Sequence, residues 1–234
     1  MIVGDSLVAL LDGLHRASGG ALALVSGRSI ESLDRLFSPF CGVAVGLHGM
    51  EMRLSPGAEP ERRRTDGPPG ALRESVARIA ERPGVALVED KGPAIAVHHR
   101  LPAPAMQALC RELRAAGERH APGWTVLRGR QVLEIKPADA TKANGVDALM
   151  AVAPFAGSVP IAFGDDITDL DMFEAIRRHG GIAVAVGPRI AGSGDLQLDA
   201  PDESLALLRD IQDALRDGAR SERIVGLLRS RAHA

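Results

Sequence analysis

Lysine is scarce in this sequence. Lys91, Lys136 and Lys142 are the only three, and the other 25 of the 28 basic residues are arginine. A coding bias toward arginine explains the excess. Lysine is a compact point charge and arginine a planar fork, so a tight phosphate site can accept one and reject the other. The three lysines are therefore either residual surface charges or residues that a site requires.

Cysteine and long apolar runs are also scarce. Cys41 and Cys110 lie far apart in apolar surroundings, which predicts two buried, reduced thiols in a cytoplasmic protein. No apolar run reaches the roughly 18 residues of a membrane-spanning helix, and the N-terminal segment lacks the basic leader of a signal peptide. The formal charge of -2 gives no electrostatic reason to expect a nucleic acid or a membrane as partner.

The order of apolar segments predicts the fold. The 234 residues suffice for one large domain or for a core with an inserted unit. A helix at 6–15 precedes a strand at 21–25, and a turn and a helix at 30–37 follow this strand directly. Strand, turn and helix in this order are typical of a parallel α/β sheet, to which a strand at 42–46 is added.

Residues 54–70 interrupt this order, because proline, glycine and charge dominate there. The next segments are a helix at 71–82, strands at 85–89 and 94–99, a helix at 103–119, and strands at 125–127 and 132–135. They predict an antiparallel sheet with helices on one face. The last ones are a helix at 142–150, strands at 159–163, 182–186 and 196–198, a helix from 201, and a tail from 217 that is expected to fray. We therefore expect an α/β core of residues 1–53 and 137–234, interrupted by an α+β cap of residues 54–136.

Three carboxylates follow the predicted strand 159–163. Asp165, Asp166 and Asp169 repel one another, so such a cluster is costly unless a hard cation offsets the charge. The carboxyl ends of parallel strands are also where ligands bind. Helix capping is the alternative, but it needs only one aspartate. The spacing thus favours a metal site.

Two further segments are candidates for an anion site. Ser26, Gly27 and Arg28 follow the strand 21–25 and open a helix, where a hydroxyl and accessible backbone N–H groups can bind an anion. Lys142 opens another helix and is either a cation facing phosphate or a solvated lysine. Each signal is weak alone, since strand–Ser–Gly turns are common.

Taken in order, these segments are similar to the motifs of haloacid-dehalogenase phosphatases, and the chain resembles the trehalose-6-phosphate phosphatase family in particular. The matching segments are LALVSGRSIESLDRLF, GLHGMEMR, VEDKGPAIAVHHR, GRQVLEIKPADATKANG, FGDDITDLDMF and GIAVAVG. They span about residues 6 to 190. The resemblance implies a Rossmann-like haloacid-dehalogenase core with an inserted α+β cap.

The resemblance also implies roles for single residues of the core. Ser26 would hydrogen-bond the transferring phosphoryl group, with the amide of Gly27 and with Arg28 nearby. Lys142 would neutralise phosphoryl charge and orient the nucleophile. Asp165 would bind Mg²⁺, with Asp166 and Asp169 as further ligands or as partners of the ligands.

In the cap, the family positions that hold sugar hydroxyls correspond to Glu89, Lys91, Arg100, Arg130 and Glu134. Arg130 replaces the lysine that is more usual there, and Lys142 is followed by alanine where the family often has glycine. The implied activity is Mg²⁺-dependent hydrolysis of trehalose 6-phosphate, a small-molecule substrate, to trehalose and phosphate. The alternatives are a phosphatase for another sugar phosphate and a non-catalytic relative that binds a sugar phosphate.

One family motif has no counterpart in the sequence. Family members carry a strand ending in Asp-x-Asp-Gly-Thr ahead of the serine motif, and its first aspartate attacks phosphorus to form an aspartyl-phosphate. The 25 residues before Ser26 hold Asp5 and Asp12 but no Asp-x-Asp. We therefore expect such a strand to be encoded upstream of Met1, or the chain to be non-catalytic, and we expect the chain as printed to be inactive.

Overall fold

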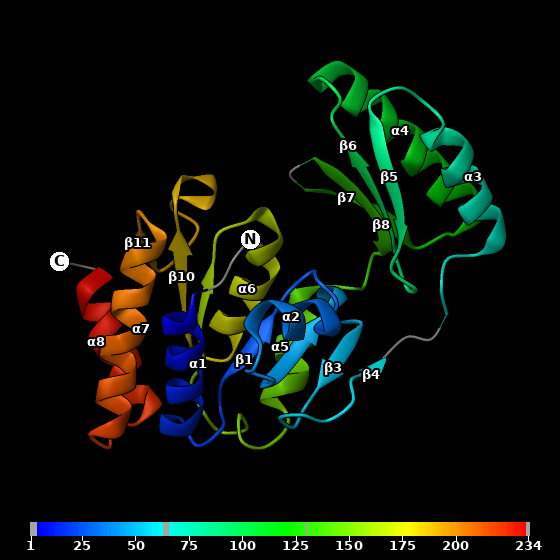
Figure 1. Cartoon of the computed structure of the whole chain (residues 1–234). Coiled ribbons are helices and arrows are strands. Elements are labelled where there is room, and N and C mark those ends of the chain that lie inside the picture. The colour runs from blue at the N-terminus through cyan, green and yellow to red at the C-terminus, as the bar shows by residue number, and fades with distance from the viewer. Residues whose placement is uncertain (1–3, 63–65, 130, 233–234) are drawn as a thin grey trace. The chain divides into compact units, whose positions relative to one another are not determined.

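The computed structural model describes residues 4–62, 66–129 and 131–232. It divides the chain into unit 1, Met1–Glu61 and Thr141–Ala234, and unit 2, Arg62–Ala140. The chain thus leaves unit 1 once, forms unit 2 and returns (Figure 1). Residues 54–61, which the sequence pattern assigned to the insert, lie in unit 1. Residues 137–140, assigned to the core, lie in unit 2, where Lys136 Nζ donates to the carbonyl oxygen of Ala140.

One sheet of unit 1 has three parallel strands in the order β11-β10-β9. These are β9 (Ile161–Gly164), β10 (Ile182–Val186) and β11 (Leu196–Leu198). Successive side chains of β10 point to opposite faces of the sheet. Ile182 and Val184 pack against α1 (Asp5–Ala17), α7 (Pro201–Arg216) and α8 (Ser221–Ala232). Ala183 and Ala185 pack against α6 (Leu170–Arg178). The sheet is therefore covered by helices on both faces.

The other sheet of unit 1 has the order β1-β2-β3-β4. Its strands are β1 (Ala23–Val25), β2 (Val43–Gly46), β3 (Glu51–Arg53) and β4 (Glu61–Arg62). The pair β1 and β2 is parallel, and β3 runs antiparallel to β2. Ala44 packs against α2 (Ile30–Phe37), whereas Val43 and Val45 pack against Leu149 of α5 (Lys142–Met150) on the other face.

The two sheets of unit 1 are separate. Among the described residues, β1 pairs only with β2 and β9 pairs only with β10, so each of these strands is an edge. Both edges are half-buried, although β2 is fully buried. Val25 and Ala162, one from each edge strand, pack against the same hydrophobic cluster around Val146 of α5. Helix α5 therefore connects two sheets that share no ladder hydrogen bond.

Unit 2 is a four-stranded antiparallel sheet in the order β5-β6-β8-β7. Its strands are β5 (Val85–Asp90), β6 (Ile95–His99), β7 (Trp124–Gly129) and β8 (Val132–Pro137), and its helices are α3 (Gly70–Ala80) and α4 (Ala103–His120). The two helices cover one face, where Val97, Leu133 and Ile135 pack against Leu72 and Leu113. The opposite face carries the alternate residues of each strand.

Two expectations from the sequence are wrong. Residues after Asp217 were expected to fray, but α8 forms there because Ile224, Val225 and Leu228 make one apolar stripe that is buried against β10 and β11. Cys41 is exposed rather than buried, because it lies in the surface loop between α2 and β2. Cys110 is buried in the core of unit 2, as predicted.

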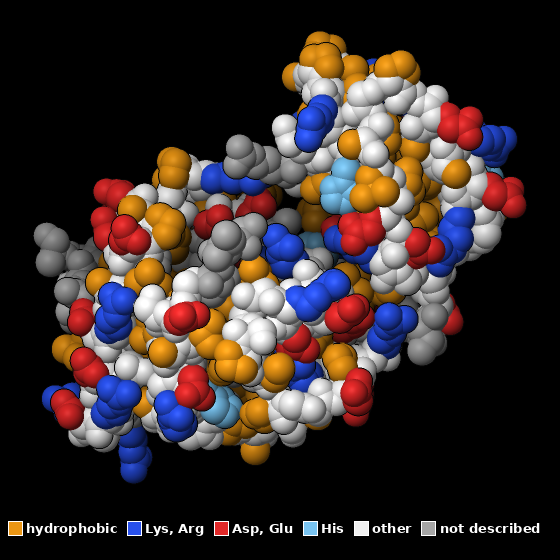
Figure 2. Space-filling view, in the orientation of Figure 1, with side chains coloured by type: hydrophobic (Ala, Val, Ile, Leu, Met, Phe, Trp, Pro, Cys, Tyr) orange, Lys and Arg blue, Asp and Glu red, His pale blue; other side chains and the backbone are white. Residues whose placement is uncertain are grey.

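The surface agrees with the balanced charge of the sequence. Acidic and basic side chains are interspersed on the face shown in Figure 2. None of the helices formed by the described residues combines the length and apolar character that crossing a bilayer requires.

Candidate functional site

The loop after β1 is built around Ser26. Its Oγ accepts a hydrogen bond from the backbone N–H of Arg28 (3.1 Å), which closes the turn. Glu51 Oε2 accepts from the N–H of Ile30 (3.0 Å), and the hydroxyl of Ser29 accepts from the N–H of Ser32 (3.2 Å). Side chains therefore accept hydrogen bonds from N–H groups in the first turn of α2. In the loop before that turn, Ser26 and Gly27 are half-buried and Arg28 is exposed. The hydroxyl hydrogen of Ser26 is not used by the bond to Arg28, so it can be donated to an anion.

Lys142 is the first residue of α5 and is buried, with 7% of its surface exposed. Thr141 caps the helix by accepting from the N–H of Asn144 (3.2 Å). The Nζ of Lys142 lies 2.5 Å from Oδ1 of Asp169. Burying an ammonium group requires a partner of opposite charge, and Asp169, 27 residues away in the sequence, provides it.

The three aspartates after β9 have different surroundings. Asp169 is buried, and its Oδ2 also accepts from the N–H groups of Asp165 and Asp166, both at 3.0 Å. Asp166 caps the short helix Ile167–Asp169 and lies 3.3 Å from the guanidinium of Arg189. The carboxylate of Asp165 is exposed and makes no hydrogen bond or ion pair with the rest of the described chain. Capping thus accounts for Asp166 and the pairing with lysine for Asp169, while a metal-binding role for the cluster stays a prediction.

The described aspartates after β9 provide one free carboxylate for a magnesium ion. Among the described residues, no group of three or more His, Cys, Asp and Glu side chains is arranged to hold a metal. Mg²⁺, however, usually keeps several waters and binds through one or two carboxylates together with phosphate oxygens. Asp165 can provide one such carboxylate. The oxygens of Asp169 are already engaged by Lys142 and two backbone amides.

Asp165→Asn is expected to abolish the Mg²⁺-dependent rise in melting temperature, because an ion that binds only the native state stabilises it by mass action. Thermal melts with and without Mg²⁺ measure this rise. The control is Asp202→Asn, which removes the same charge from an exposed position in the first turn of α7. A Mg²⁺ shift in Asp165→Asn that equals the unaltered protein's would contradict a ligand role.

Contacts between elements bring the predicted core residues together in unit 1. A methyl group on Gly27 would lie 2.4 Å from Nε2 of His48, and one on Gly49 would lie 2.6 Å from the carbonyl oxygen of Thr141. The Ser26 loop and the start of α5 are therefore joined through the segment 48–49. Lys142 then joins α5 to the aspartates after β9 through Asp169.

Asp5 and Asp12, the acids that precede Ser26, do not share this neighbourhood. Both belong to α1, which packs on α7, and Asp12 forms an ion pair with Arg16 (2.7 Å). Neither follows a strand, so the structure gives neither of them the place of an attacking carboxylate.

The predicted sugar contacts lie on unit 2. Glu89 of β5 and Glu134 of β8 are both in register with Ala96 of β6, so the two carboxylates lie on one face, turned away from α3 and α4. Lys91, whose N–H donates to Ala94 in the following turn, places its Nζ 3.3 Å from Oε2 of Glu134. Two acceptors and a cationic donor on one face can bind the hydroxyls of a polyol.

The remaining predicted sugar contacts are less defined. Arg100 follows β6 and is exposed, and Arg130 lies outside the described residues. His98, to which the sequence gave no role, has its Nε2 2.9 Å from Oε2 of Glu89. The sequence could have indicated His98, because it follows Ala96 by two residues in the strand and therefore lies on the same face of the sheet as Glu89 and Glu134. Burial, and secondarily the neighbouring His98, lowers the pKa of His99, so His99 is neutral near pH 7.

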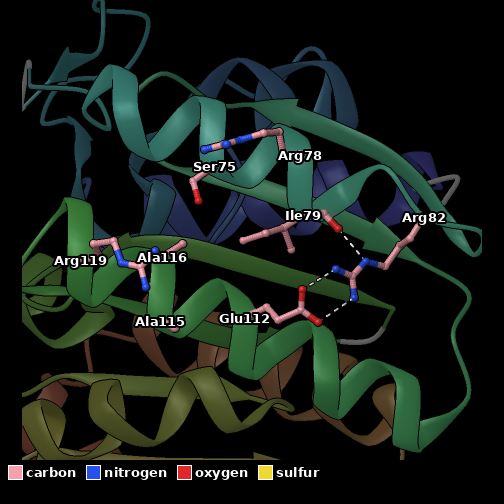
Figure 3. A pocket seen from close by; sticks show the side chains of 8 residues that line it. All are labelled: Ser75, Arg78, Ile79, Arg82, Glu112, Ala115, Ala116 and Arg119. Carbon is pink, nitrogen blue, oxygen red and sulfur yellow. Dashed lines mark hydrogen bonds and ion pairs between the residues drawn. The ribbon is translucent and has the colours of Figure 1, made fainter.

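Unit 2 has a further pocket on its helical side (Figure 3). Ser75, Ile79 and Glu112 are among its lining residues, and it encloses about 440 Å³ between α3 and α4. Arg82 closes one end through a bidentate contact with Glu112 at 3.0 and 2.5 Å. This hydrogen-bonded pair lowers the pKa of Glu112. The pocket lies on the other side of the sheet from Glu89 and Glu134 and shares no residue with them.

The chain is similar to known proteins along most of its length. Residues 1–199 match the model of the family described as trehalose-phosphatase. A probable trehalose-phosphate phosphatase of Sinorhizobium fredii is 41% identical over 82% of this chain and 72% of its own length. A trehalose-6-phosphate phosphatase of Escherichia coli is 35% identical over 84% of this chain and 76% of its own length.

Solved structures show the same fold. The C-terminal domain of a Candida albicans trehalose-6-phosphate phosphatase superposes with a TM-score of 0.76 at 22% identity, covering 91% of this chain and 84% of that one. Unit 1 with its inserted unit 2 has the haloacid-dehalogenase fold, which solved phosphatases of that superfamily share. With the family model matching well over half of the sequence, the chain belongs to the trehalose-phosphatase family of hydrolases.

Proposed function

We propose that this chain recognises trehalose 6-phosphate and carries the residues that stabilise its phosphoryl group during hydrolysis to trehalose and phosphate. The observation that carries the proposal is the buried ion pair of Lys142 and Asp169, which fixes a cation next to the aspartates that follow β9. The names of the relatives support the choice of substrate, since a related phosphatase is described as acting on trehalose 6-phosphate.

Each residue would contribute to a site for a phosphate dianion. The hydroxyl of Ser26 and the backbone at Gly27 would hydrogen-bond the phosphoryl oxygens, and Arg28 would add charge at the rim. Asp169 holds Lys142 in one orientation, so its ammonium group needs no reorganisation as negative charge develops. Asp165, with Asp166 beside it, would hold Mg²⁺, which when bound supplies further charge stabilisation to the phosphoryl oxygens. Phosphoryl transfer is catalysed mainly by such positioning and electrostatics.

Unit 2 would select the sugar. Glu89 and Glu134 would accept hydrogen bonds from hydroxyls, and Lys91, Arg100 and Arg130 would donate them. A site built to hydrogen-bond hydroxyls discriminates strongly against analogues that lack them, because its buried polar groups are then left unpaired. We further propose a cytoplasmic location, which two unpaired cysteines support.

Binding without cleavage is the second candidate. It applies if no attacking carboxylate joins Ser26 and Lys142 at the phosphoryl site. The two candidates agree on the ligand and differ only in the fate of the phosphoester bond.

Calorimetry and phosphate release test both candidates. In the presence of Mg²⁺, the chain is expected to bind trehalose 6-phosphate more tightly than glucose 6-phosphate or inorganic phosphate. Phosphate release is measured on the chain as printed and on a chain with an apolar strand ending in Asp-x-Asp-Gly-Thr joined ahead of Met1, and it separates cleavage from binding. Equal affinity for trehalose 6-phosphate and glucose 6-phosphate would point to another sugar phosphate. An extended chain that binds but never releases phosphate would leave the binding function.

A further inference from the structure

The segment GLHGMEMR contains an unusual turn directly after β2. Leu47, His48 and Gly49 have φ values of 48°, 55° and 95°. Residues other than glycine rarely adopt this left-handed conformation, and it persists only where the surrounding structure imposes it. None of the residues proposed to bind phosphate or sugar belongs to this turn.

Backbone hydrogen bonds attach the turn to the phosphate-binding loop. The N–H of Leu47 donates to the carbonyl oxygen of Arg28 (2.9 Å), and the N–H of His48 donates to that of Ser26 (3.1 Å). The imidazole of His48 is buried, with 5% of the residue's surface exposed. It lies so close over Gly27 that a methyl group there would be 2.4 Å from Nε2 and 2.6 Å from Cε1. The residues on either side of Gly27 are thus hydrogen-bonded to the turn, and Gly27 itself is in contact with the His48 ring.

The other end of the turn contacts the second phosphate-binding element. A methyl group on Gly49 would lie 2.6 Å from the carbonyl oxygen of Thr141, the capping residue directly before Lys142. One three-residue turn therefore touches both the Ser26–Arg28 loop and the start of α5.

From these contacts we infer that the Leu47–Gly49 turn, acting through the His48 ring, sets the position of the Ser26–Arg28 loop relative to Lys142, so that both face a single phosphoryl group. His48 is a positioning residue, because it acts through Gly27. The inference rests on the proposed function only in requiring that unit 1 binds phosphate.

His48→Gly separates the ring from the turn. Glycine adopts a left-handed φ freely, so this variant keeps the backbone path and removes the imidazole. Its melting temperature shows whether unit 1 still folds without the buried ring. Its Kd for inorganic phosphate with Mg²⁺ is expected to rise at least about tenfold, since a displacement of about 1 Å in a binding group can cost on the order of 10²-fold in rate.

Gly27→Ala tests the same contact from the other side. Its methyl group cannot fit beneath the ring, so phosphate affinity is expected to fall here as well. In Gly27→Ala/His48→Gly the methyl group has room, and the combined loss is expected to be no larger than that of either single variant. Gly226→Ala is the control, because a methyl group there meets nothing within 4 Å.

Calorimetric titration with inorganic phosphate and thermal melts measure these effects, and titration with trehalose monitors unit 2. Phosphate affinity of His48→Gly within about twofold of the unaltered chain, or fully additive losses in the double variant, would overturn the inference. Loss of trehalose binding together with phosphate binding in both single variants would also overturn it, because the effect would then be general unfolding. Failure of the proposed substrate appears separately, as equal affinity of the unaltered chain for trehalose 6-phosphate and phosphate.

Discussion

Lys142→Ala is expected to lower kcat for trehalose 6-phosphate by at least about 10²-fold in a form of the enzyme that carries the attacking aspartate. Removing one preorganised donor from a site where charge develops typically costs that much. In the printed chain, the same variant is expected to weaken the binding of inorganic phosphate. Steady-state kinetics and calorimetry measure the two effects, and a loss of kcat below about threefold would contradict the role of Lys142.

The effect on chemistry must be separated from an effect on folding. The side chains of Lys142 and Asp169 are only 9% and 6% exposed. Removing one partner of such a pair leaves a buried charge and destabilises a protein by about 3–5 kcal/mol. Lys142→Ala/Asp169→Asn removes both charges and is expected to regain stability without regaining phosphate binding. Recovery of phosphate binding in this double variant would show that Lys142 acts only in folding.

Glu134→Ala is expected to reduce kcat/KM for trehalose 6-phosphate by about 10²-fold or more in the active form, because a site that hydrogen-bonds hydroxyls depends on each buried acceptor. Hydrolysis of a small aryl phosphate, which offers no sugar hydroxyls, is expected to change by less than about threefold. Parallel assays with the two substrates measure the selectivity.

Glu112→Ala is the matched control for Glu134→Ala. Glu112 is also a glutamate of unit 2 paired with a cation, but it lies on the helical side of the sheet, against Arg82. It is expected to leave the hydrolysis of both substrates unchanged. Equal losses on both substrates in Glu134→Ala would argue against unit 2 as the part that recognises the sugar.

Much of the fold could be predicted because local patterns determine it. The apolar run at 21–25 and the helical spacing of Ile30 and Leu33 indicate β1 and α2, and both elements form there. Helix α8 was missed because arginines and serines surround its apolar stripe, whose burial depends on β10 and β11, elements distant in the sequence. Local composition carries no information about such a distant partner.

The sequence named candidate site residues, but it could not predict which of them contact one another. The sequence singled out Lys142 and Asp169 separately, but their contact at 2.5 Å depends on how α5 packs against α6. The left-handed backbone of Leu47 and His48 likewise could not be predicted from residue type, because only glycine adopts that conformation freely.

The separated sheets of unit 1 bear on how this protein behaves in concentrated solution. β1 and β9 each present, among the described residues, one side of backbone without a strand partner. Such an edge can pair with a strand of another molecule and so begin aggregation or strand exchange. At high protein concentration, these two half-buried edges are among the places where such pairing is expected to begin.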